Sequence, residues 1–381
     1  MKSLRHIVES APRMRATAMH GLRLEEEPQP LSPALWDWTN VRSVLLIRLR
    51  SIGDTVLATP SLYALKRFLP NARVDILLED WVAPVLEGFS YVDNVLTLKR
   101  NSTTARARVM RQLRSLRYDV VYNLHGGTTA TLLTRASGAT RRVGLETYQY
   151  SRLYTHLAPS PLLLWKREQT HSVEQQLALL GWTGVPVSDR PRTQLAVVEH
   201  AATSVAQRLR EAGWDEKSPL ALIHPAVAFA TKQWASEKFA RVADDLAGRG
   251  FTVVVITAPT EGQVATRLEQ SSSARIISFN NLSLPEVTAL ASRARLFVGN
   301  DSGIAHIAAA VALPAVVIFG SSNIAHWSPW ATAAAEVVFE ELDCQPCHGY
   351  YCEKFAQPEC ISRVPFEKVI AAVDRVLRES T

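Results

Sequence analysis

A polar turn at 299–303, GNDSG, lies between apolar runs and carries residue types that could hold an anion. Residues 296–298 have the composition of a buried parallel strand, and the Ala-rich stretch 304–311 favours a helix. Pro314 ends that helix, and 315–319 is typical of the next buried strand. A helix that starts where a parallel strand ends directs free N–H groups and its positive dipole end at a ligand, which favours phosphate.

Within this turn, Asp301 or Ser302 is placed to cap the helix, and Gly303 would let a ligand approach the backbone closely. His306 follows one helical turn later and faces the same end of the helix. The alternative interpretation is an ordinary capped turn between a strand and a helix, without a ligand.

A second turn of this kind, RSIGD at 50–54, follows the first apolar strand, 44–49, and opens a helix at 55–68. Asp54 therefore stands at a helix N-terminus and at the carboxyl end of a strand, where open α/β sheets bind their ligands. Its simpler interpretation is a helix cap.

Positive charge is concentrated at 99–117, where seven Lys and Arg residues occur with no acidic residue and the apolar residues share one helical face. The charged side is either a solvated helix face or a docking surface for an acceptor rich in phosphate and carboxylate. His125 follows the strand at 119–124 and precedes two glycines. It is either a structural histidine or a residue for acceptor contact or proton relay.

Length and composition set wider bounds on the protein. The 381 residues suggest two domains, and an apolar fraction of 47% is enough for full cores. The net charge of +6 indicates an anionic partner, whether nucleic acid, a membrane surface or a phosphorylated substrate. No apolar run approaches the ~20 residues of a membrane span and no signal peptide is apparent, so we expect a cytosolic protein. Residues 1–40 form a basic leader, either a surface helix attracted to anionic lipid or a partly disordered tail.

All four cysteines lie in one segment, as Cys344, Cys347, Cys352 and Cys360. Four thiols this close could hold one tetrahedral metal ion, although their spacing is not that of a standard zinc finger. Free structural thiols are the alternative, and disulfides are disfavoured in a cytosolic protein.

The motif GNDSG-x-x-H-x-A-A-A followed by P-x-V-x-x-F-G, at 299–320, resembles glycosyltransferase family 9, the ADP-heptose:lipopolysaccharide heptosyltransferases. Further matches keep the family's order along the chain: Arg48-x-x-Ser51-Ile52-Gly53-Asp54 with Thr59-Pro60, Arg141-Arg142-Val143-Gly144, His224-Pro225, Lys232-x-Trp234 and the Cys-rich segment. The resemblance covers roughly 41–381, and this ordered set of motifs is specific.

The resemblance implies an α/β, GT-B-like fold in which two Rossmann-like, doubly wound domains face each other across a cleft. We expect an N-terminal extension at 1–40, an acceptor domain at 41–190, a sugar-nucleotide domain at 191–343, and a Cys-rich segment with a final helix at 344–381. As in similar transferases, that helix is expected to pack back on the first domain.

For the reaction, the resemblance implies an inverting transfer of heptose or a related sugar from a nucleotide diphosphate sugar, such as ADP-heptose, to a lipopolysaccharide-core or similar anionic acceptor. Asp54 would be the catalytic base, Lys232 would contact the donor pyrophosphate, and Asp301 would accept hydrogen bonds from the sugar. The other expected donor-side residues are Thr231, Glu261, Ser302, Gly303 and His306, and those on the acceptor side are Ser51, Gly53, His125 and Arg142.

Catalysis is expected to require no metal, because the lysine and the helix dipole can replace one. The resemblance implies that the four cysteines allow a structural zinc or iron ion. We expect no nucleic-acid partner, and peripheral contact with the inner face of the cytoplasmic membrane is left open. Two other classes also stay open. One is a sugar-nucleotide epimerase of the same architecture, which would need no acceptor. The other is a non-catalytic binder of nucleic acid or an anionic surface, although no recognisable nucleic-acid-reading motif is present. A dinucleotide dehydrogenase is disfavoured because no G-x-G-x-x-G follows the first strand.

Overall fold

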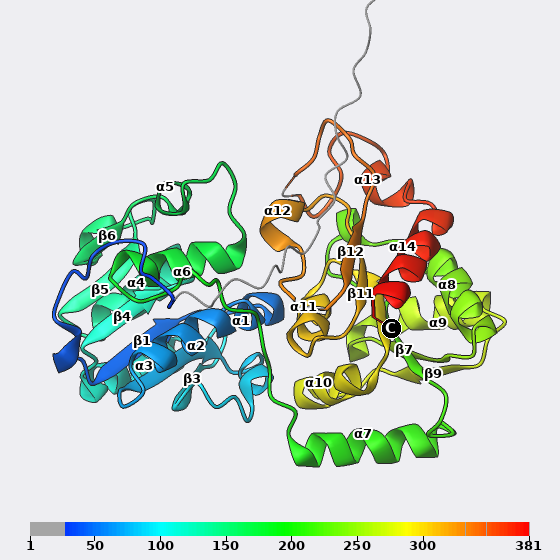
Figure 1. The fold of residues 1–381 in the computed structure, drawn as a ribbon, viewed down its shortest axis with the longest axis horizontal. Helices are drawn as coiled ribbons and strands as arrows, with labels where there is room; N and C mark the ends of the chain where they lie inside the picture. Colours follow the sequence, from blue (N-terminus) through cyan, green and yellow to red (C-terminus); the bar gives the residue numbers. More distant parts are fainter. Residues whose placement is uncertain (1–26, 332, 348, 381) are drawn as a thin grey trace, which may run out of the picture.

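The computed structural model describes residues 27–331, 333–347 and 349–380. Within these residues, two parallel six-stranded sheets form two domains that lie side by side (Figure 1). The predicted α/β class, with two Rossmann-like domains, is therefore confirmed. The basic leader up to residue 26, where a lipid-binding helix was one interpretation, lies outside the described residues.

The first sheet has the strand order β3-β2-β1-β4-β5-β6 and is built from one continuous part of the chain. Its strands are β1 (Ser43–Ile47), β2 (Arg73–Glu79), β3 (Asn94–Leu98), β4 (Val120–Asn123), β5 (Arg141–Leu145) and β6 (His156–Ala158). Its helices are α1 (Ile52–Val56), α2 (Thr59–Phe68), α3 (Thr103–Leu116), α4 (Gly127–Ala136), α5 (Pro161–Trp165) and α6 (Ser172–Trp182), with short 3₁₀ turns η1 (Trp38–Asn40), η2 (Ala83–Leu86) and η3 (Ser151–Leu153).

The second sheet has the strand order β12-β11-β10-β7-β8-β9. Its strands are β7 (Leu220–His224), β8 (Thr252–Ile256), β9 (Ile276–Phe279), β10 (Leu296–Asn300), β11 (Ala315–Ile318) and β12 (Ala335–Val338). Its helices are α7 (Glu199–Glu211), α8 (Ser236–Gly248), α9 (Gly262–Ser271), α10 (Leu284–Arg293), α11 (Gly303–Ala310), α12 (Ile324–Trp327), α13 (Glu359–Ser362) and α14 (Phe366–Glu379), with η4 (Ala230–Lys232) and η5 (Pro259–Glu261).

Both sheets are covered on both faces, which explains why their central strands are apolar throughout. In β1, Val44 and Leu46 face the core shared with α2 and α6, whereas Leu45 and Ile47 face α3 and α4. The turns after β1 and β10 lie next to the point where each sheet reverses its strand order. Ligands of doubly wound folds bind at this point, so both predicted turns are placed for binding.

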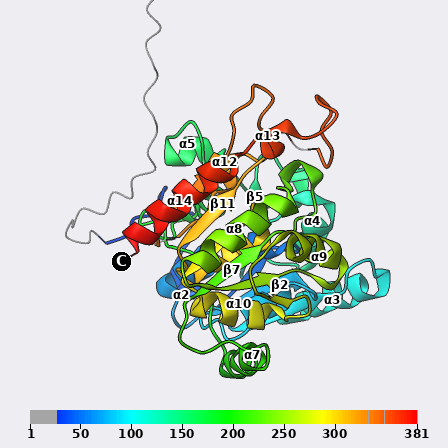
Figure 2. The same cartoon turned by 90° about the vertical axis from the view of Figure 1, so that its right-hand side faces the viewer.

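The final helix, α14, corrects one expectation. It packs on β11, β12 and α8 of the second domain and not on the first domain (Figure 1), and Figure 2 shows it beside α8 and β11. Its buried residues Val369, Ala372 and Val373 join the core that contains Trp234 and Ile318. The physical reason is that β11 and β12 would otherwise expose an apolar sheet face, and this face is long enough to bury one amphipathic helix.

Residues 27–40 pack against the first domain. The Trp38 Nε1 atom donates a 3.0 Å hydrogen bond to the carbonyl of Thr183, and the Leu31 amide donates a 3.0 Å bond to the carbonyl of Gly181. Across the described residues, no helix has the length and apolar character needed to cross a bilayer.

Candidate active site

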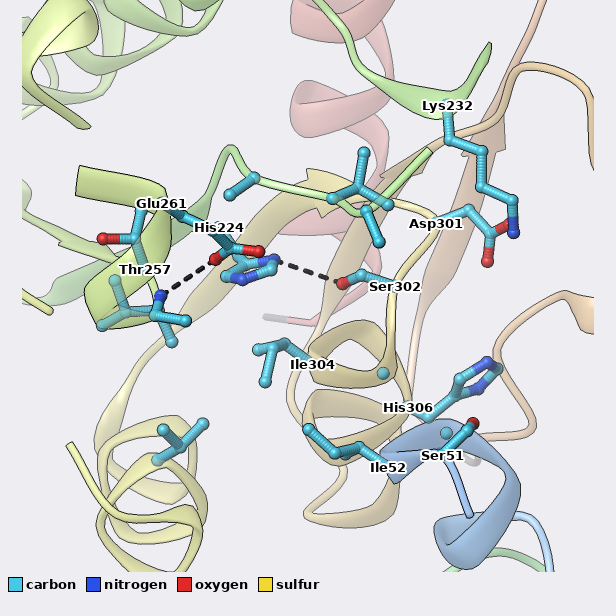
Figure 3. A pocket seen from close by; sticks show the side chains of 18 of the residues that line it. Ser51, Ile52, His224, Lys232, Thr257, Glu261, Asp301, Ser302, Ile304 and His306 are labelled. Atoms are coloured by element: carbon cyan, nitrogen blue, oxygen red, sulfur yellow. Dashed lines mark hydrogen bonds and ion pairs between the residues drawn. The ribbon is translucent and has the colours of Figure 1, made fainter. Parts of the chain in front are cut away.

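A cavity of about 620 Å³ lies between the two domains, at the carboxyl ends of β1, β7 and β10. Its walls are Ser51 to Asp54 from the first domain and the loops after β7, β8 and β10 from the second (Figure 3). This volume suits a ligand of nucleotide-sugar size, because small-molecule sites usually measure about 300–1,000 Å³. Parts of the chain that are far apart in sequence therefore meet at one site.

The N-terminus of α11 forms one wall of the cavity. Ser302 is its N-cap residue, but no side chain caps the helix amides. The Ser302 hydroxyl lies 3.2 Å from Nδ1 of His224 (Figure 3). Burial lowers the pKa of His224 to about 4, so this imidazole is neutral at pH 7. The uncapped amides and the helix dipole are therefore available for an anion.

Lys232 and Asp301 form an ion pair beside this helix end. The Lys232 Nζ atom lies 2.8 Å from Oδ2 of Asp301, whose side chain is only 5% exposed. Ser322 donates a hydrogen bond to the same oxygen. No described residue donates to Oδ1, which leaves it available for a ligand hydroxyl. Asp301 thus fixes the position of the lysine ammonium group.

The Cys-rich segment supports the loop that carries Lys232. The rings of Phe229 and Tyr350 stack with centroids 4.2 Å apart and an angle of 8° between planes. Thr231 donates a 3.1 Å hydrogen bond to the carbonyl of Gly349 and is 1% exposed. Thr231, predicted as a donor-binding residue, therefore does not line the cavity and instead joins the loop to this segment.

Asp54 lies on the opposite wall, in the first turn of α1. Arg48 donates to its Oδ1 atom and, through Nη1, to the carbonyl of Leu124. No described residue donates to Oδ2, and the side chain is 17% exposed. Ser51 caps the helix by accepting a 3.2 Å bond from the Asp54 amide, and it adopts a strained φ of 75°. Asp54 is thus oriented with one carboxylate oxygen open to the cavity.

Gly53 and Gly303 lie where α1 of the first domain packs on α11 of the second. A Cβ atom at Gly303 would lie 2.7 Å from Cβ of Ile52, and one at Gly53 would lie 2.7 Å from Cδ2 of His306. Gly303 was expected to admit a ligand, but in this conformation the space next to it is filled by α1. His306 is buried between the domains, its Nδ1 atom has no hydrogen-bond partner among the described residues, and burial lowers its pKa.

The far end of the cavity combines an apolar surface with one carboxylate. Ile256, Leu284 and Val287 form an apolar surface there. Glu261 also lines this end, and its Oε2 atom accepts a 2.9 Å hydrogen bond from the Ala258 amide. A donor-side role for Glu261 stays a prediction.

Two predicted acceptor residues lie elsewhere. Arg142 lines neither this cavity nor the smaller cavity on the first domain. Its guanidinium instead donates hydrogen bonds to the carbonyls of Leu153 (3.0 Å from Nε) and Ala139. His125 lines a separate cavity on the first domain. Arg48 and His224 have no predicted role, although both stand inside the sequence motifs that carry the family resemblance.

The four thiols are free, and Cys360 is buried. Burial and the neighbouring thiols raise its pKa to about 11, so it is protonated at pH 7. Within 27–331, 333–347 and 349–380, no group of three or more Cys, His, Asp or Glu residues is arranged to hold a metal ion. Metal binding by these cysteines stays a prediction without geometric support.

The profile of glycosyltransferase family 9 (heptosyltransferase) matches residues 106–355. Lipopolysaccharide heptosyltransferase 3 of Escherichia coli is 27% identical over 348 residues, which cover 87% of this chain and 98% of that protein.

Solved structures that share the fold include two family members. A family 9 glycosyltransferase from Veillonella parvula DSM 2008 superposes with a TM-score of 0.78 at 21% identity, over 89% of this chain and 98% of the other. The E. coli ADP-heptose lipopolysaccharide heptosyltransferase II has a TM-score of 0.72 at 20% identity, over 88% and 98% of the two chains.

The fold and the paired loops across the cavity define a two-domain enzyme of the glycosyltransferase type. The chain belongs to glycosyltransferase family 9, the heptosyltransferase family, as its motifs predicted. It is therefore a glycosyltransferase, which disfavours both a non-catalytic binder and an epimerase.

The ring stack beneath the lysine loop gives a first prediction. Tyr350→Ala should weaken ADP binding by about 2- to 10-fold, because a stacked aromatic pair contributes about 0.5–1.5 kcal/mol. Calorimetric titration with ADP measures the effect. Tyr351→Ala is the control, since Tyr351 is 78% exposed and stacks on no described ring. Equal ADP affinities of the two variants would mean that the stack does not support the loop.

The buried histidine under Ser302 gives a second prediction. The pKa of His224 is about 4 in the folded protein and about 6.5 when unfolded, so its stabilising effect is complete above pH 6.5 and declines as the pH falls toward 4. His224→Gln should flatten the pH dependence of the free energy of unfolding in this window, by on the order of 3 kcal/mol. Denaturant unfolding at several pH values measures it. His200→Gln, at a histidine side chain that is 67% exposed, is the control.

Proposed function

We propose that this enzyme transfers heptose, with inversion, from ADP-heptose to the core sugars of a lipopolysaccharide precursor. The observation that carries the proposal is the placement of Asp54 on one wall of the cavity and of Lys232 and the α11 amides on the other. The donor, ADP-heptose, and the acceptor class, lipopolysaccharide, are those in the names of its relatives.

In the proposed reaction the acceptor hydroxyl oxygen attacks the anomeric carbon of the donor. The open Oδ2 atom of Asp54 takes the hydroxyl proton, and Arg48 keeps the carboxylate in position. The bond from the anomeric carbon to the phosphate oxygen breaks, and its electron pair leaves with ADP. One displacement at this carbon inverts its configuration.

The leaving diphosphate gains negative charge during this step. Lys232 and the first amides of α11 are oriented toward it before the reaction begins, so they stabilise the transition state more than the ground state. The free Oδ1 atom of Asp301 would accept a hydrogen bond from the sugar. The adenosine would lie on the apolar surface near Glu261.

Because lipopolysaccharide precursors are lipid-linked, we further propose that the enzyme acts in the cytoplasm at the inner face of the membrane. We also propose that no metal is needed for the transfer itself. Activity should then survive prolonged chelation with EDTA, whatever the four cysteines bind.

The base assignment gives a third prediction. Asp54→Asn keeps an oxygen for Arg48 but removes the basic group, so turnover should fall by about 10²–10⁴ with ADP affinity nearly unchanged. Initial rates of heptose transfer and ADP calorimetry measure the two quantities. Glu146→Gln alters an exposed carboxylate of the same domain and serves as the control. Wild-type turnover in Asp54→Asn would exclude this residue as the base.

The lysine gives a fourth prediction, which tests the donor side. Lys232→Ala should lower kcat/KM. The loss should correspond to about 2–4 kcal/mol of transition-state stabilisation, which is the scale of losing one donor that stabilises a developing anion. Lys232→Arg keeps the charge beside Asp301 and should recover part of the loss. Lys217→Ala removes an exposed lysine of the same domain as a control, and thermal unfolding checks that each variant is folded. Unaltered kcat/KM and ADP affinity in Lys232→Ala would place the donor phosphates elsewhere.

A further inference from the structure

Trp81 presents an open aromatic ring to the large cavity from the first domain. It follows β2, lines the cavity and is 45% exposed. No other tryptophan in the described part of the chain is exposed to this degree. A tryptophan side chain buries about 150–250 Å² when it packs, so a ring left open in a cavity can cover a large part of a ligand.

The ring is fixed in place before any ligand arrives. Its Nε1 atom donates a 2.8 Å hydrogen bond to Oε2 of Glu79, which is itself buried. The next residue, Val82, is fully buried in the core. The polar edge of the indole is thus satisfied within the protein, and its faces are left for an apolar contact. A side chain held in this way loses little freedom when a ligand binds.

The ring borders the apolar surface that Leu284 and Val287 form at the far end of the cavity. Trp81 directly precedes η2, and η2 packs on α10 across the domain boundary. Helix α10 carries both Leu284 and Val287, and Val82 belongs to the same core as Val287. The first domain therefore supplies an aromatic ring at the end of the cavity where the second domain supplies an aliphatic surface.

The other large aromatic rings that line the cavity already have partners. Phe229 stacks on Tyr350, and the ring of Trp327 lies 4.4 Å from that of His326. Trp81, by contrast, stacks on no ring and has no cation over its face within residues 27–331, 333–347 and 349–380. Its faces are thus available for a ligand.

The surroundings of the ring favour a flat ligand over a sugar. Glu79, Asp80 and Val82 do not line this cavity, so no hydrogen-bonding side chain of the same loop stands beside the ring. The hydroxyl groups of an enclosed sugar need hydrogen-bond partners. A nucleobase instead presents a π face, which stacks on an aromatic side chain whatever the identity of the base.

We propose that Trp81 stacks on the nucleobase of the donor, opposite the aliphatic surface of the second domain, so that both domains bind the nucleotide. This inference rests on the proposed function, because it assigns a residue to the donor of that reaction. Trp81 binds the part of the donor that leaves, and Asp54 and Lys232 act on the reacting end. A nucleotide held from both sides also favours the arrangement in which α1 packs on α11.

The stack is tested with full-length enzyme, ADP, and inorganic pyrophosphate as a ligand without a base. Trp81→Ala should bind ADP about 5- to 100-fold more weakly, the range expected when an aromatic ring under a base is removed. Its affinity for pyrophosphate should equal that of wild type. Trp81→Phe keeps a ring and should lose less ADP affinity than Trp81→Ala. Calorimetry measures ADP binding, and competition with ADP measures pyrophosphate binding.

The matched control is Tyr150→Ala, which removes a ring of the same domain that is 49% exposed and does not line this cavity. It should bind ADP as wild type does. Unchanged ADP affinity in Trp81→Ala would overturn the proposal, and so would an equal loss of ADP and pyrophosphate affinity. A higher KM for the acceptor in Trp81→Ala, with ADP affinity unchanged, would assign the ring to the acceptor instead.

Tryptophan fluorescence tests the same contact without the alanine variant. The chain has nine tryptophans, so the difference in fluorescence between wild type and Trp81→Phe isolates the signal of Trp81. ADP should quench this signal, because the base lies on the ring, and pyrophosphate should leave it unchanged. No response to ADP, or the same response to both ligands, would mean that the base does not stack on Trp81.

These experiments separate the inference from the proposed function. Heptose transfer by wild type, together with ADP binding that does not depend on Trp81, would refute the stack and leave the transferase proposal standing. ADP binding that depends on Trp81, together with no transfer from ADP-heptose, would refute the proposed reaction and support the stack.

Discussion

The site depends on how closely α1 and α11 approach each other across the domain boundary. Side chains at Gly53 or Gly303 would come within 2.7 Å of His306 or Ile52, closer than atoms in proteins normally pack. Glycine at both positions allows the contact, and the contact brings Asp54 and the α11 amides to the same cavity. The two sheets supply rigid frames, whereas this pair of glycines sets the distance between the groups that must act together.

The same contact brings two positive helix ends near each other, and local carboxylates offset their charge. Asp54 stands in the first turn of α1, and Asp301 directly precedes the N-cap residue of α11. Each carboxylate is held by a cation, Arg48 or Lys232, and burial lowers the pKa of the nearby His306. A diphosphate entering this cavity therefore meets fixed donors that need little rearrangement, which is the condition for electrostatic catalysis.

Much of the fold could be predicted because β1 and β10 are buried on both faces, and their apolar runs are readable in the sequence. Strand β5 is harder to recognise in the sequence, because it starts with two arginines. The amphipathic pattern of α14 predicts a helix but not which sheet it covers. The family resemblance likewise assigned Thr231 and Arg142 to the site without revealing that their side chains bind backbone carbonyls. The ion pair of Arg48 with Asp54 crosses a strand–helix turn, which no periodicity reports.

Each sheet is formed from one uninterrupted part of the chain, which has a consequence for synthesis on the ribosome. All six strands of the first sheet precede residue 160, so that domain can fold while the second is still being translated. The second domain cannot bury its own β11 and β12 until α14, well downstream of β12, has left the exit tunnel. Until then it exposes an apolar parallel sheet, the kind of surface that chaperones recognise. Nascent chains of this enzyme should therefore need protection late in translation.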